Sequence, residues 1–315
     1  MIPLEEIRAA QERVEGSAIR TPLVRLNKGN SSAEIYLKLE NLQPIGSFKL
    51  RGATNAIKAV PPGELKNGVY TSSAGNMAQG IAWCAKRMGI PCSVIVPDRA
   101  SKAKIEAITR LGATIIKVPF AEWWDVMTTH NFDGLDGLFI HPVANANVIA
   151  GNGTIGLEVV DDLPDFDAIV IPYGGGGLSC GIASALKGLN SNAKVFACEV
   201  DGAAPLAASL DAGKAVEIEM TPSFVDGIGS PTVLPEMWPL AQELLDGSLV
   251  VSAEDVASAI RLLAERNNVI AEGAGAASVA AALNGIANAR RIVCVISGGN
   301  IDLAKLTQIF RGETP

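Results

Sequence analysis

The sequence is poor in the side chains that most often carry acid–base and metal chemistry. It contains only two histidines, His130 and His141, among 315 residues. Few histidines are therefore available to form a Ser-His-Asp triad or a histidine-based zinc site. Any proton transfer that the protein catalyses is expected to depend on a side chain other than imidazole.

Other absences narrow the class of protein further. The five cysteines include no CxxC pair and lie in apolar stretches, which is typical of free buried thiols in a reducing cytoplasm. No Lys/Arg-rich run is present and the formal net charge is -7, which argues against nucleic acid and an anionic membrane as partners. The N-terminal MIPLEEIRAAQERVEG lacks the apolar core of a signal peptide, and the apolar run at 274–283 is too short to span a membrane.

What the chain does contain is a regular alternation of short β-branched runs, Gly-rich turns and alanine-rich helical stretches. GVYTSS precedes GNMAQGIAWCAKRMG, PCSVIVP precedes SKAKIEAITRLG, and DAIVIPYGGGG precedes LSCGIASALKGL. Continuous apolar strands alternating with helices predict an α/β fold with a parallel sheet covered on both faces. In such sheets ligands bind at the carboxyl ends of the strands, where these turns lie.

The most specific of these turns is YGGGGLSCG, at 173–181. Its four glycines follow a predicted strand and precede a predicted helix. Successive backbone N–H groups without side chains can converge on an anion, and the helix dipole adds a positive end. We interpret the turn as a phosphate site. It lacks the lysine and Ser/Thr of a Walker loop and the GxGxxG spacing of a dinucleotide site, and a tightly packed turn is the alternative.

Two further turns are less specific. TSSAGNMAQG, at 71–80, places serines and an asparagine at a helix start, where they would either cap the helix or bind a carboxylate. CVISGGN, at 294–300, ends the last predicted strand with Ser297, which would either cap a turn or face a bound ring.

Lys49 in QPIGSFKLRGA lies between a phenylalanine and a leucine near the mouth of a predicted helix. Partial desolvation lowers the pKa of a lysine, so such an amine can act as nucleophile and base near neutral pH. Together with a phosphate site and a second anion site, it suggests pyridoxal 5'-phosphate, which has a phosphate to anchor and an aldehyde that condenses with an amine.

Six motifs carry a resemblance to a known family. GSFKLRGA, SSAGNMAQG, VIAGNGTIGLEV, GGGGLSCGIA, EGAGA and SGGN occur in the order found in fold-type II pyridoxal-phosphate enzymes (tryptophan synthase β-like), from about Thr21 to Asn300. The chain resembles most the threonine/serine dehydratase and serine racemase branch. The resemblance implies two three-layer α/β domains with mostly parallel sheets: a large cofactor-binding domain of 1–49 and 147–315, and a small mobile domain of 50–146.

The resemblance also implies a role for each matching residue. Lys49 is expected to form a Schiff base with the cofactor and to remove the Cα proton of the substrate. Phe48 would pack beside the ring, Asn76 would hydrogen-bond the 3-oxygen, and Ser297 would meet the pyridine nitrogen. The phosphate would be held by the backbone of Gly174, Gly175, Gly176, Gly177 and Leu178. The substrate would be bound by Ser72, Ser73, Ala74, Gly75, Asn76, Met77 and Val143.

Departures from the family pattern bear on the substrate. Racemases of the family have a serine at the position of Ala74, so racemisation is expected to be weak. Met77 replaces the usual histidine and Val143 a polar or aromatic residue, which would make the pocket around the β-substituent more apolar. We therefore expect a 3-hydroxy amino acid with an apolar β-group, with phenylserine and threonine as candidates and hydroxyaspartate disfavoured. Met77 as a neutral packing substitution is the alternative.

A third departure concerns metal. Some relatives bind a divalent ion through a glutamate, a carbonyl and an aspartate; here Glu199 and Ala203 hold the first two places, but Pro205 fills the third. We expect no bound metal, and Glu199 would equally serve as a satisfied acid at a strand end.

The predicted function is a dehydratase that converts a 3-hydroxy-L-amino acid to a 2-oxo acid and ammonia, in a cytoplasmic homodimer. The chain ends soon after SGGN, so a catabolic enzyme without a regulatory domain is expected. The alternatives are an amino acid racemase, a β-replacement enzyme, a dehydratase of a hydroxylated compatible-solute derivative, and a non-catalytic phosphate- or nucleotide-binding protein.

Overall fold

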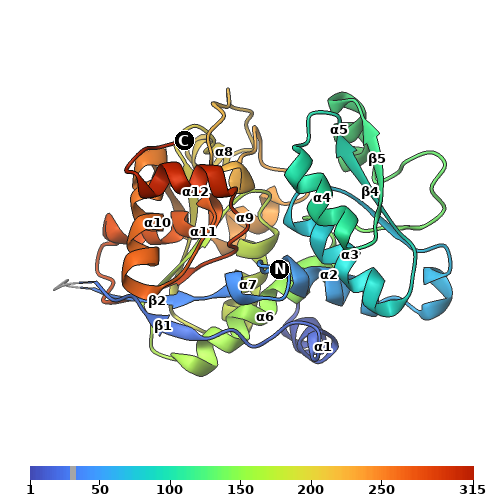
Figure 1. The fold of residues 1–315 in the computed structure, drawn as a ribbon. Coiled ribbons are helices and arrows are strands. Elements are labelled where there is room, and N and C mark those ends of the chain that lie inside the picture. Colours follow the sequence, from blue (N-terminus) through green and yellow to red (C-terminus); the bar gives the residue numbers. More distant parts are fainter. Residues whose placement is uncertain (29–32) are drawn as a thin grey trace.

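The structure, a computed structural model, describes residues 1–28 and 33–315, which form two units around two separate sheets (Figure 1). The six-stranded sheet has the order β1-β2-β10-β7-β8-β9, and the four-stranded sheet has the order β5-β4-β3-β6. The strands are β1 (Leu23–Arg25), β2 (Glu34–Lys38), β3 (Val69–Ser72), β4 (Cys92–Pro97), β5 (Thr114–Val118), β6 (Leu138–Phe139), β7 (Ala168–Pro172), β8 (Lys194–Val200), β9 (Gly247–Val251) and β10 (Arg291–Val295). We call the parts of the molecule around these sheets the six-stranded unit and the four-stranded unit.

The helices follow the strands in alternation, as the sequence pattern predicts. They are α1 (Leu4–Val14), α2 (Lys49–Lys58), α3 (Asn76–Met88), α4 (Lys102–Arg110), α5 (Phe120–Thr129), α6 (Ala146–Asp162), α7 (Gly177–Gly188), α8 (Pro205–Ala212), α9 (Trp238–Leu244), α10 (Ala253–Asn267), α11 (Gly273–Leu283) and α12 (Leu303–Phe310). Their starts have recognisable local causes. Ser252 and Asp255 form a reciprocal capping box at α10, and the side chain of Asn145 accepts the N–H of Val148 at α6.

Both sheets are parallel except for the pairing of β1 with β2, which is antiparallel. Parallel strands end at the same edge of a sheet. The turns after β2, β10 and β7, three neighbouring strands, therefore lie side by side at one edge of the six-stranded sheet. This edge receives the GSFK, SGGN and GGGG motifs, and the arrangement is the one in which open α/β sheets bind ligands.

Helices cover both faces of the six-stranded sheet. Alternate residues of β10 point to opposite faces: Ile292 and Cys294 pack in a core with α10 and α11, whereas Val293 and Val295 pack in a core with α6, α7 and α9. This period of two in a fully apolar strand is what a sheet buried on both sides requires.

The four-stranded sheet is a second three-layer unit. Val94 and Val96 of β4 pack with α2 and α3 on one face, while Ile95 packs with Val126 of α5 on the other. The predicted α/β class with two three-layer parts and mostly parallel sheets is thus confirmed. The domain boundaries, with 50–146 as the small domain, stay a prediction.

Among the residues that the structure describes, no helix combines the length and the apolar character that crossing a membrane requires.

Candidate active site

Lys49 begins α2, and its amine is held by one carbonyl. Its Nζ donates a hydrogen bond to the carbonyl oxygen of Pro142 at 2.9 Å and lies 5.2 Å from the centre of the Phe48 ring. Burial lowers the pKa of Lys49 to about 8, although the negative charge of Glu272 opposes the change. A lysine in these surroundings is a far better nucleophile and base at neutral pH than an exposed one.

The glycine turn after β7 presents a row of backbone N–H donors. Among the residues that the structure describes, no backbone oxygen accepts the N–H groups from Gly174 to Ser179, whereas Cys180 donates to Gly176 and starts the hydrogen bonds of α7. Such unsatisfied donors at a helix start, together with the positive end of the helix dipole, suit a phosphate.

Side chains could not be accommodated in this turn. A Cβ on Gly175 would lie 2.6 Å from Val143 Cγ2, and one on Gly177 would lie 2.9 Å from the carbonyl oxygen of Val143. Gly176 has a φ of 92°, in the left-handed region that favours glycine. The glycines therefore let Val143 pack closely against the turn, and they bring the turn next to the carbonyl of Pro142, which accepts the hydrogen bond of Lys49.

Ser297 is fixed to the lysine segment through the backbone. The N–H of Phe48 donates to the carbonyl oxygen of Ser297 at 3.0 Å, and Ser47 forms an antiparallel bridge with Gly298. Ser297 is buried and follows β10 by two residues, and β10 lies between β2 and β7 in the sheet. The structure thus brings together Phe48, Lys49, Ser297 and the glycine turn from separate parts of the sequence, and their roles toward a cofactor stay a prediction.

Asn76 connects the two units of the fold. Its side-chain amide donates to Glu272 Oε1 at 2.8 Å, and its amide oxygen accepts from Asn300 Nδ2 at 2.8 Å. Burial raises the pKa of Glu272 to about 7, while the hydrogen bond from Asn76 works in the opposite direction. Glu272 is a site residue that sequence reasoning missed, although the EGAGA motif that contains it was among the six signals.

The other residues of the predicted carboxylate loop lie in different surroundings. Gly75 donates its N–H to the hydroxyl of Ser73 at 3.3 Å, so these two residues form a compact turn before α3. Ala74 is half-buried against the core of the four-stranded unit. The hydroxyl of Ser72 instead donates to the carbonyl oxygen of Trp123. The proton of this hydroxyl is therefore directed away from Lys49. Direct contact of Ser73, Ala74 and Gly75 with a substrate stays a prediction.

Met77 and Val143, the two residues expected to shape the pocket, pack against protein. Met77 is 1% exposed and lies in the apolar core with Leu50 and Ala53. Val143 faces Gly175. The packing of Met77 supports the alternative reading of this residue as a core substitution, and a direct contact of either side chain with substrate stays a prediction.

His141 shapes the turn that presents Pro142 to Lys49. Its Nδ1 accepts the N–H groups of Val143 at 3.1 Å and Ala144 at 2.7 Å. Burial lowers the pKa of His141 to about 4, so the ring is neutral near pH 7 and carries its proton on Nε2. The Nδ1 atom of His141 thus acts as a hydrogen-bond acceptor that holds the backbone of this turn, and it carries no proton to donate.

Glu199 is engaged in capping. Its two carboxylate oxygens accept the N–H groups of Leu206 and Ala207 at 2.8 Å each, and the hydroxyl of Ser248 donates to Oε2 at 2.6 Å. These bonds explain a buried acid at the end of β8 without an ion, as the alternative reading of the sequence states. The expectation of no bound metal stays a prediction.

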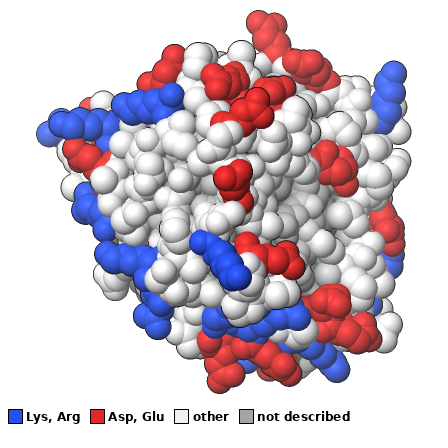
Figure 2. All heavy atoms as spheres, turned by 90° about the vertical axis from the view of Figure 1, so that its right-hand side faces the viewer, with Lys and Arg blue, Asp and Glu red and all other residues white. Residues whose placement is uncertain are grey.

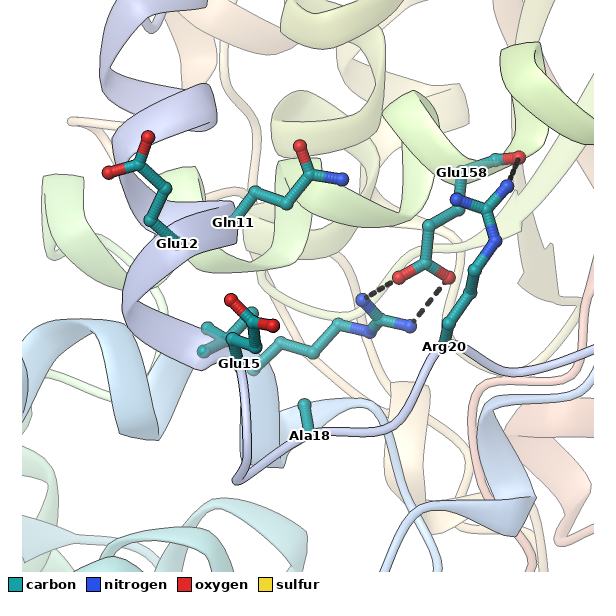
Figure 3. A pocket seen from close by; sticks show the side chains of 8 residues that line it. Gln11, Glu12, Glu15, Ala18, Arg20 and Glu158 are labelled. Carbon is teal, nitrogen blue, oxygen red and sulfur yellow. Dashed lines mark hydrogen bonds and ion pairs between the residues drawn. The ribbon is translucent and has the colours of Figure 1, made fainter.

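A pocket of about 380 Å³ lies behind the lysine segment, between α1, α2 and α6 (Figure 3). Arg51 of α2 reaches its floor and makes two hydrogen bonds to Glu158, at 2.6 and 2.9 Å, while it also pairs with Glu40 at 2.8 Å. Lys38 adds a contact of 2.6 Å to Glu158. This pocket is lined by neither Lys49 nor the glycine turn, and its buried charges are paired with one another.

The fold and the site together define a class of protein: a fold-type II enzyme in which a lysine amine, a turn of backbone N–H donors and a buried serine meet at one sheet edge. The donors present suit the phosphate, the aldehyde and the pyridine nitrogen of pyridoxal phosphate. The family described as pyridoxal-phosphate dependent enzymes matches residues 14–298, and the chain belongs to this family.

Three relatives illustrate the similarity. The L-threonine ammonia-lyase of Thermotoga maritima is 40% identical over 98% of this chain and 78% of its own length. The catabolic L-threonine dehydratase of Escherichia coli is 35% identical over 98% of this chain and 96% of its own length. The solved structure of maize serine racemase has a TM-score of 0.91 at 31% identity, covering 98% of this chain and 97% of that one.

Proposed function

We propose that the protein is a pyridoxal-phosphate-dependent dehydratase, or ammonia-lyase, that converts a 3-hydroxy-L-amino acid to a 2-oxo acid and ammonia. The observation that carries the proposal is the Lys49 amine, which has a lowered pKa and lies beside a turn of free backbone donors. The relatives named threonine ammonia-lyase and threonine dehydratase support this type of reaction.

When bound, pyridoxal phosphate supplies the electron-withdrawing ring that makes the Cα proton of an amino acid acidic. The backbone of Gly174 to Leu178 would hold its phosphate, and Phe48 would pack beside its ring. The hydroxyl of Ser297 would meet the pyridine nitrogen. A neutral hydroxyl does not favour protonation of the pyridine nitrogen, so the ring would withdraw electrons less strongly. This suits an elimination in which negative charge at Cα is short-lived.

In the proposed reaction Lys49 takes the proton from Cα, and the substrate loses its β-hydroxyl group as water. A Cα–H bond and a Cβ–O bond break, and a double bond forms between the two carbons. The enamine that leaves the enzyme takes up water and releases ammonia, which yields the 2-oxo acid. The turn from Ser73 to Gly75 would hold the substrate carboxylate.

The substrate is proposed to be serine- or threonine-like, with phenylserine as the candidate that carries a larger β-group. A racemase is the alternative within the family, since a serine racemase is 37% identical to this chain. Ala74 argues against it, because no hydroxyl is available there to return a proton from the second face of Cα. A dehydratase of a hydroxylated compatible-solute derivative would use the same chemistry, and a panel of substrates distinguishes it.

We further propose that 50–146 moves as a small domain and closes over the substrate, which would exclude water during the elimination. Asn76 of this segment already reaches Glu272 of the other. A homodimer is proposed because large apolar side chains are exposed beside the site: Leu42 is 49% exposed, and its neighbour Asn41 bonds to Ile270, which is 39% exposed. The cytoplasm is proposed as compartment because all five cysteines are buried free thiols.

The test is reductive trapping combined with a substrate panel. Wild-type protein with cofactor is expected to be yellow, to lose its near-visible absorbance on borohydride treatment, and to carry the pyridoxyl adduct on Lys49 by mass spectrometry. The Lys49→Ala variant is expected to lose this absorbance and at least about a thousand-fold of the 2-oxo acid formation. Lys58→Ala, which changes the exposed lysine at the other end of α2, is the matched control. An adduct on another residue would overturn the proposal.

A further inference from the structure

The hydroxyl of Tyr173 is buried without a hydrogen-bond partner. Tyr173 lies between β7 and the first glycine of the turn and is 1% exposed. Among the residues that the structure describes, no group forms a hydrogen bond with its hydroxyl oxygen. A buried tyrosine hydroxyl usually has a partner, because leaving it without one costs free energy. The hydroxyl of Tyr36, by comparison, donates to Glu34 at 3.2 Å. The Tyr173 hydroxyl is therefore a candidate to bind a ligand.

This hydroxyl lies against the turn of backbone N–H donors. A Cβ on Gly176 would be 3.0 Å from the Tyr173 hydroxyl oxygen and 3.1 Å from Cε2 of its ring. Gly176 directly precedes α7 and lies within the segment from Gly174 to Ser179, whose N–H groups no backbone oxygen accepts in the part of the chain that the structure describes. Because Gly176 has no side chain, the tyrosine ring can reach the turn. The unpartnered hydroxyl and the unpartnered N–H groups thus occur at the same place.

The surroundings of Tyr173 keep its hydroxyl protonated and leave it without an acceptor. Burial raises the pKa of Tyr173, and the negative charge of Glu199 acts in the same direction. Both carboxylate oxygens of Glu199 already accept hydrogen bonds from other groups of the protein. Tyr173 itself belongs to the apolar core that contains Leu206, which holds its ring in place. Near neutral pH the hydroxyl is therefore a fixed donor that can serve an anion.

The molecule offers an anion little general attraction. Its formal net charge is -7, and the face that the four-stranded unit presents carries acidic as well as basic side chains near its middle (Figure 2). At the turn itself, the described atoms that a Cβ on each of the four glycines would approach most closely belong to backbone, Val143, Ile228 and Tyr173, and none belongs to a lysine or arginine. Neutral donors must therefore hold a phosphate at this turn, and the Tyr173 hydroxyl is the side-chain donor among these groups.

We propose that the Tyr173 hydroxyl donates a hydrogen bond to the phosphate of pyridoxal phosphate, beside the backbone N–H groups of the glycine turn. This inference rests on the proposed function and adds a side chain to its cofactor site. Sequence reasoning assigned the phosphate to the four glycines and Leu178 alone. A hydrogen bond to a charged group contributes more than one between neutral groups, so its loss is measurable as a change in cofactor affinity.

The test compares two aldehydes, one with the phosphate and one without it. The Kd values of the apoprotein for pyridoxal phosphate and for pyridoxal are measured by absorbance titration. Tyr173→Phe keeps the ring and removes only the hydroxyl. In this variant the Kd for pyridoxal phosphate is expected to rise about ten-fold, while the Kd for pyridoxal stays at the wild-type value. Tyr36→Phe is the matched control with both Kd values unchanged, since its hydroxyl reaches Glu34 at the end of β2 that lies away from the lysine segment. An unchanged Kd for pyridoxal phosphate in Tyr173→Phe, or an equal rise for both aldehydes, overturns the contact.

Urea unfolding separates the contact from a purely structural role. Without cofactor, Tyr173→Phe is expected to be at least as stable as wild type, because the hydroxyl that it loses has no partner among the described residues. With a fixed concentration of pyridoxal phosphate, the variant is expected to gain less stability than wild type, since stabilisation by a ligand follows its Kd. A loss of stability in the apoprotein would show that the hydroxyl is bonded within the protein and would overturn the contact.

The same titrations distinguish this inference from the proposed function. A yellow wild type whose Tyr173→Phe variant binds pyridoxal phosphate as tightly overturns the contact alone and leaves the dehydratase proposal standing. A wild type that forms no Schiff base with either aldehyde overturns the proposed function, and the contact with it.

Discussion

Lys49 Nζ lies 2.9 Å from the carbonyl oxygen of Pro142, a residue that precedes the turn held by His141. The reactive amine is thus positioned by a backbone group, and that backbone group is positioned by an imidazole. A protein with two histidines uses one of them to support its lysine.

Removing the acceptor of His141 is expected to disturb the lysine. In His141→Leu the N–H groups of Val143 and Ala144 lose their partner, at a cost of about 1–3 kcal/mol in the free energy of unfolding, and kcat is expected to fall about ten-fold. His141→Asn keeps an acceptor in place of Nδ1 and is expected to restore most of both quantities. Lys58→Ala, at an exposed position at the end of α2, serves as control. Equal kcat values in all three variants would contradict the positioning role.

The glycine turn makes a prediction about cofactor affinity. Gly175→Ala would place a Cβ 2.6 Å from Val143 Cγ2, so either the turn or residues 142–144 must move. The Kd for pyridoxal phosphate, measured by absorbance titration, is expected to rise at least about ten-fold. Because Val143→Ala removes the obstructing methyl groups, the double variant is expected to recover most of the affinity. Gly63→Ala, where a Cβ would meet open space, is the control; a double variant as weak as Gly175→Ala would show that Val143 is not the obstacle.

Glu272 gives the apoprotein a pH-dependent stability. Its pKa in the folded protein is raised from 4.5 to about 7, so between these values the folded state keeps a proton that the unfolded state has lost. The free energy of unfolding therefore falls as the pH rises through this range. Glu272→Gln is expected to match wild type near pH 5 and to be more stable by about 1 kcal/mol near pH 8.

The measurement is urea unfolding of both proteins across this pH range, without cofactor. Glu254→Gln, at an exposed position on α10, controls for loss of a charge as such. A difference between wild type and Glu272→Gln that stays constant from pH 5 to pH 8 would contradict the raised pKa.

The buried ion network behind Lys49 is expected to be fragile. Arg51→Met would leave Glu40 and Glu158 buried without their main partner, so a loss of about 3–5 kcal/mol in the free energy of unfolding is expected. Arg20→Met changes an arginine that is half exposed and pairs with Asp161 and Asp162 at the surface, where the loss is expected to be about 0–1 kcal/mol. Similar losses in the two variants by urea unfolding would show that burial does not distinguish the two arginines.

The sequence predicted where those parts of the site lie whose position is set by the backbone at strand ends. The position of Lys49, the glycine turn and Ser297 follow from short motifs at strand ends, and parallel strands bring such ends to one edge. Side-chain neighbours could not be predicted in this way. Glu272 meets Asn76 because the two units pack against each other, and His141 acts through the turn at 142–144. Met77 is buried in a core because α2 and α3 meet there. Substrate-contacting roles for Met77 and Val143 were inferred from residue type alone, without that packing.

The place of β10 in its sheet has a consequence for biosynthesis. This strand, at 291–295, pairs with both β2 and β7, so the sheet has a gap in its middle until residue 295 has been made. A nascent chain leaving the ribosome can pair β7 with β8, but it lacks the strand that joins them to β2 and to the lysine segment. The four-stranded unit can form early in translation, whereas the site at Lys49 can assemble only once residues 291–295 have emerged. Truncation before Arg291 should therefore give a chain with an ordered middle and no capacity to hold the cofactor.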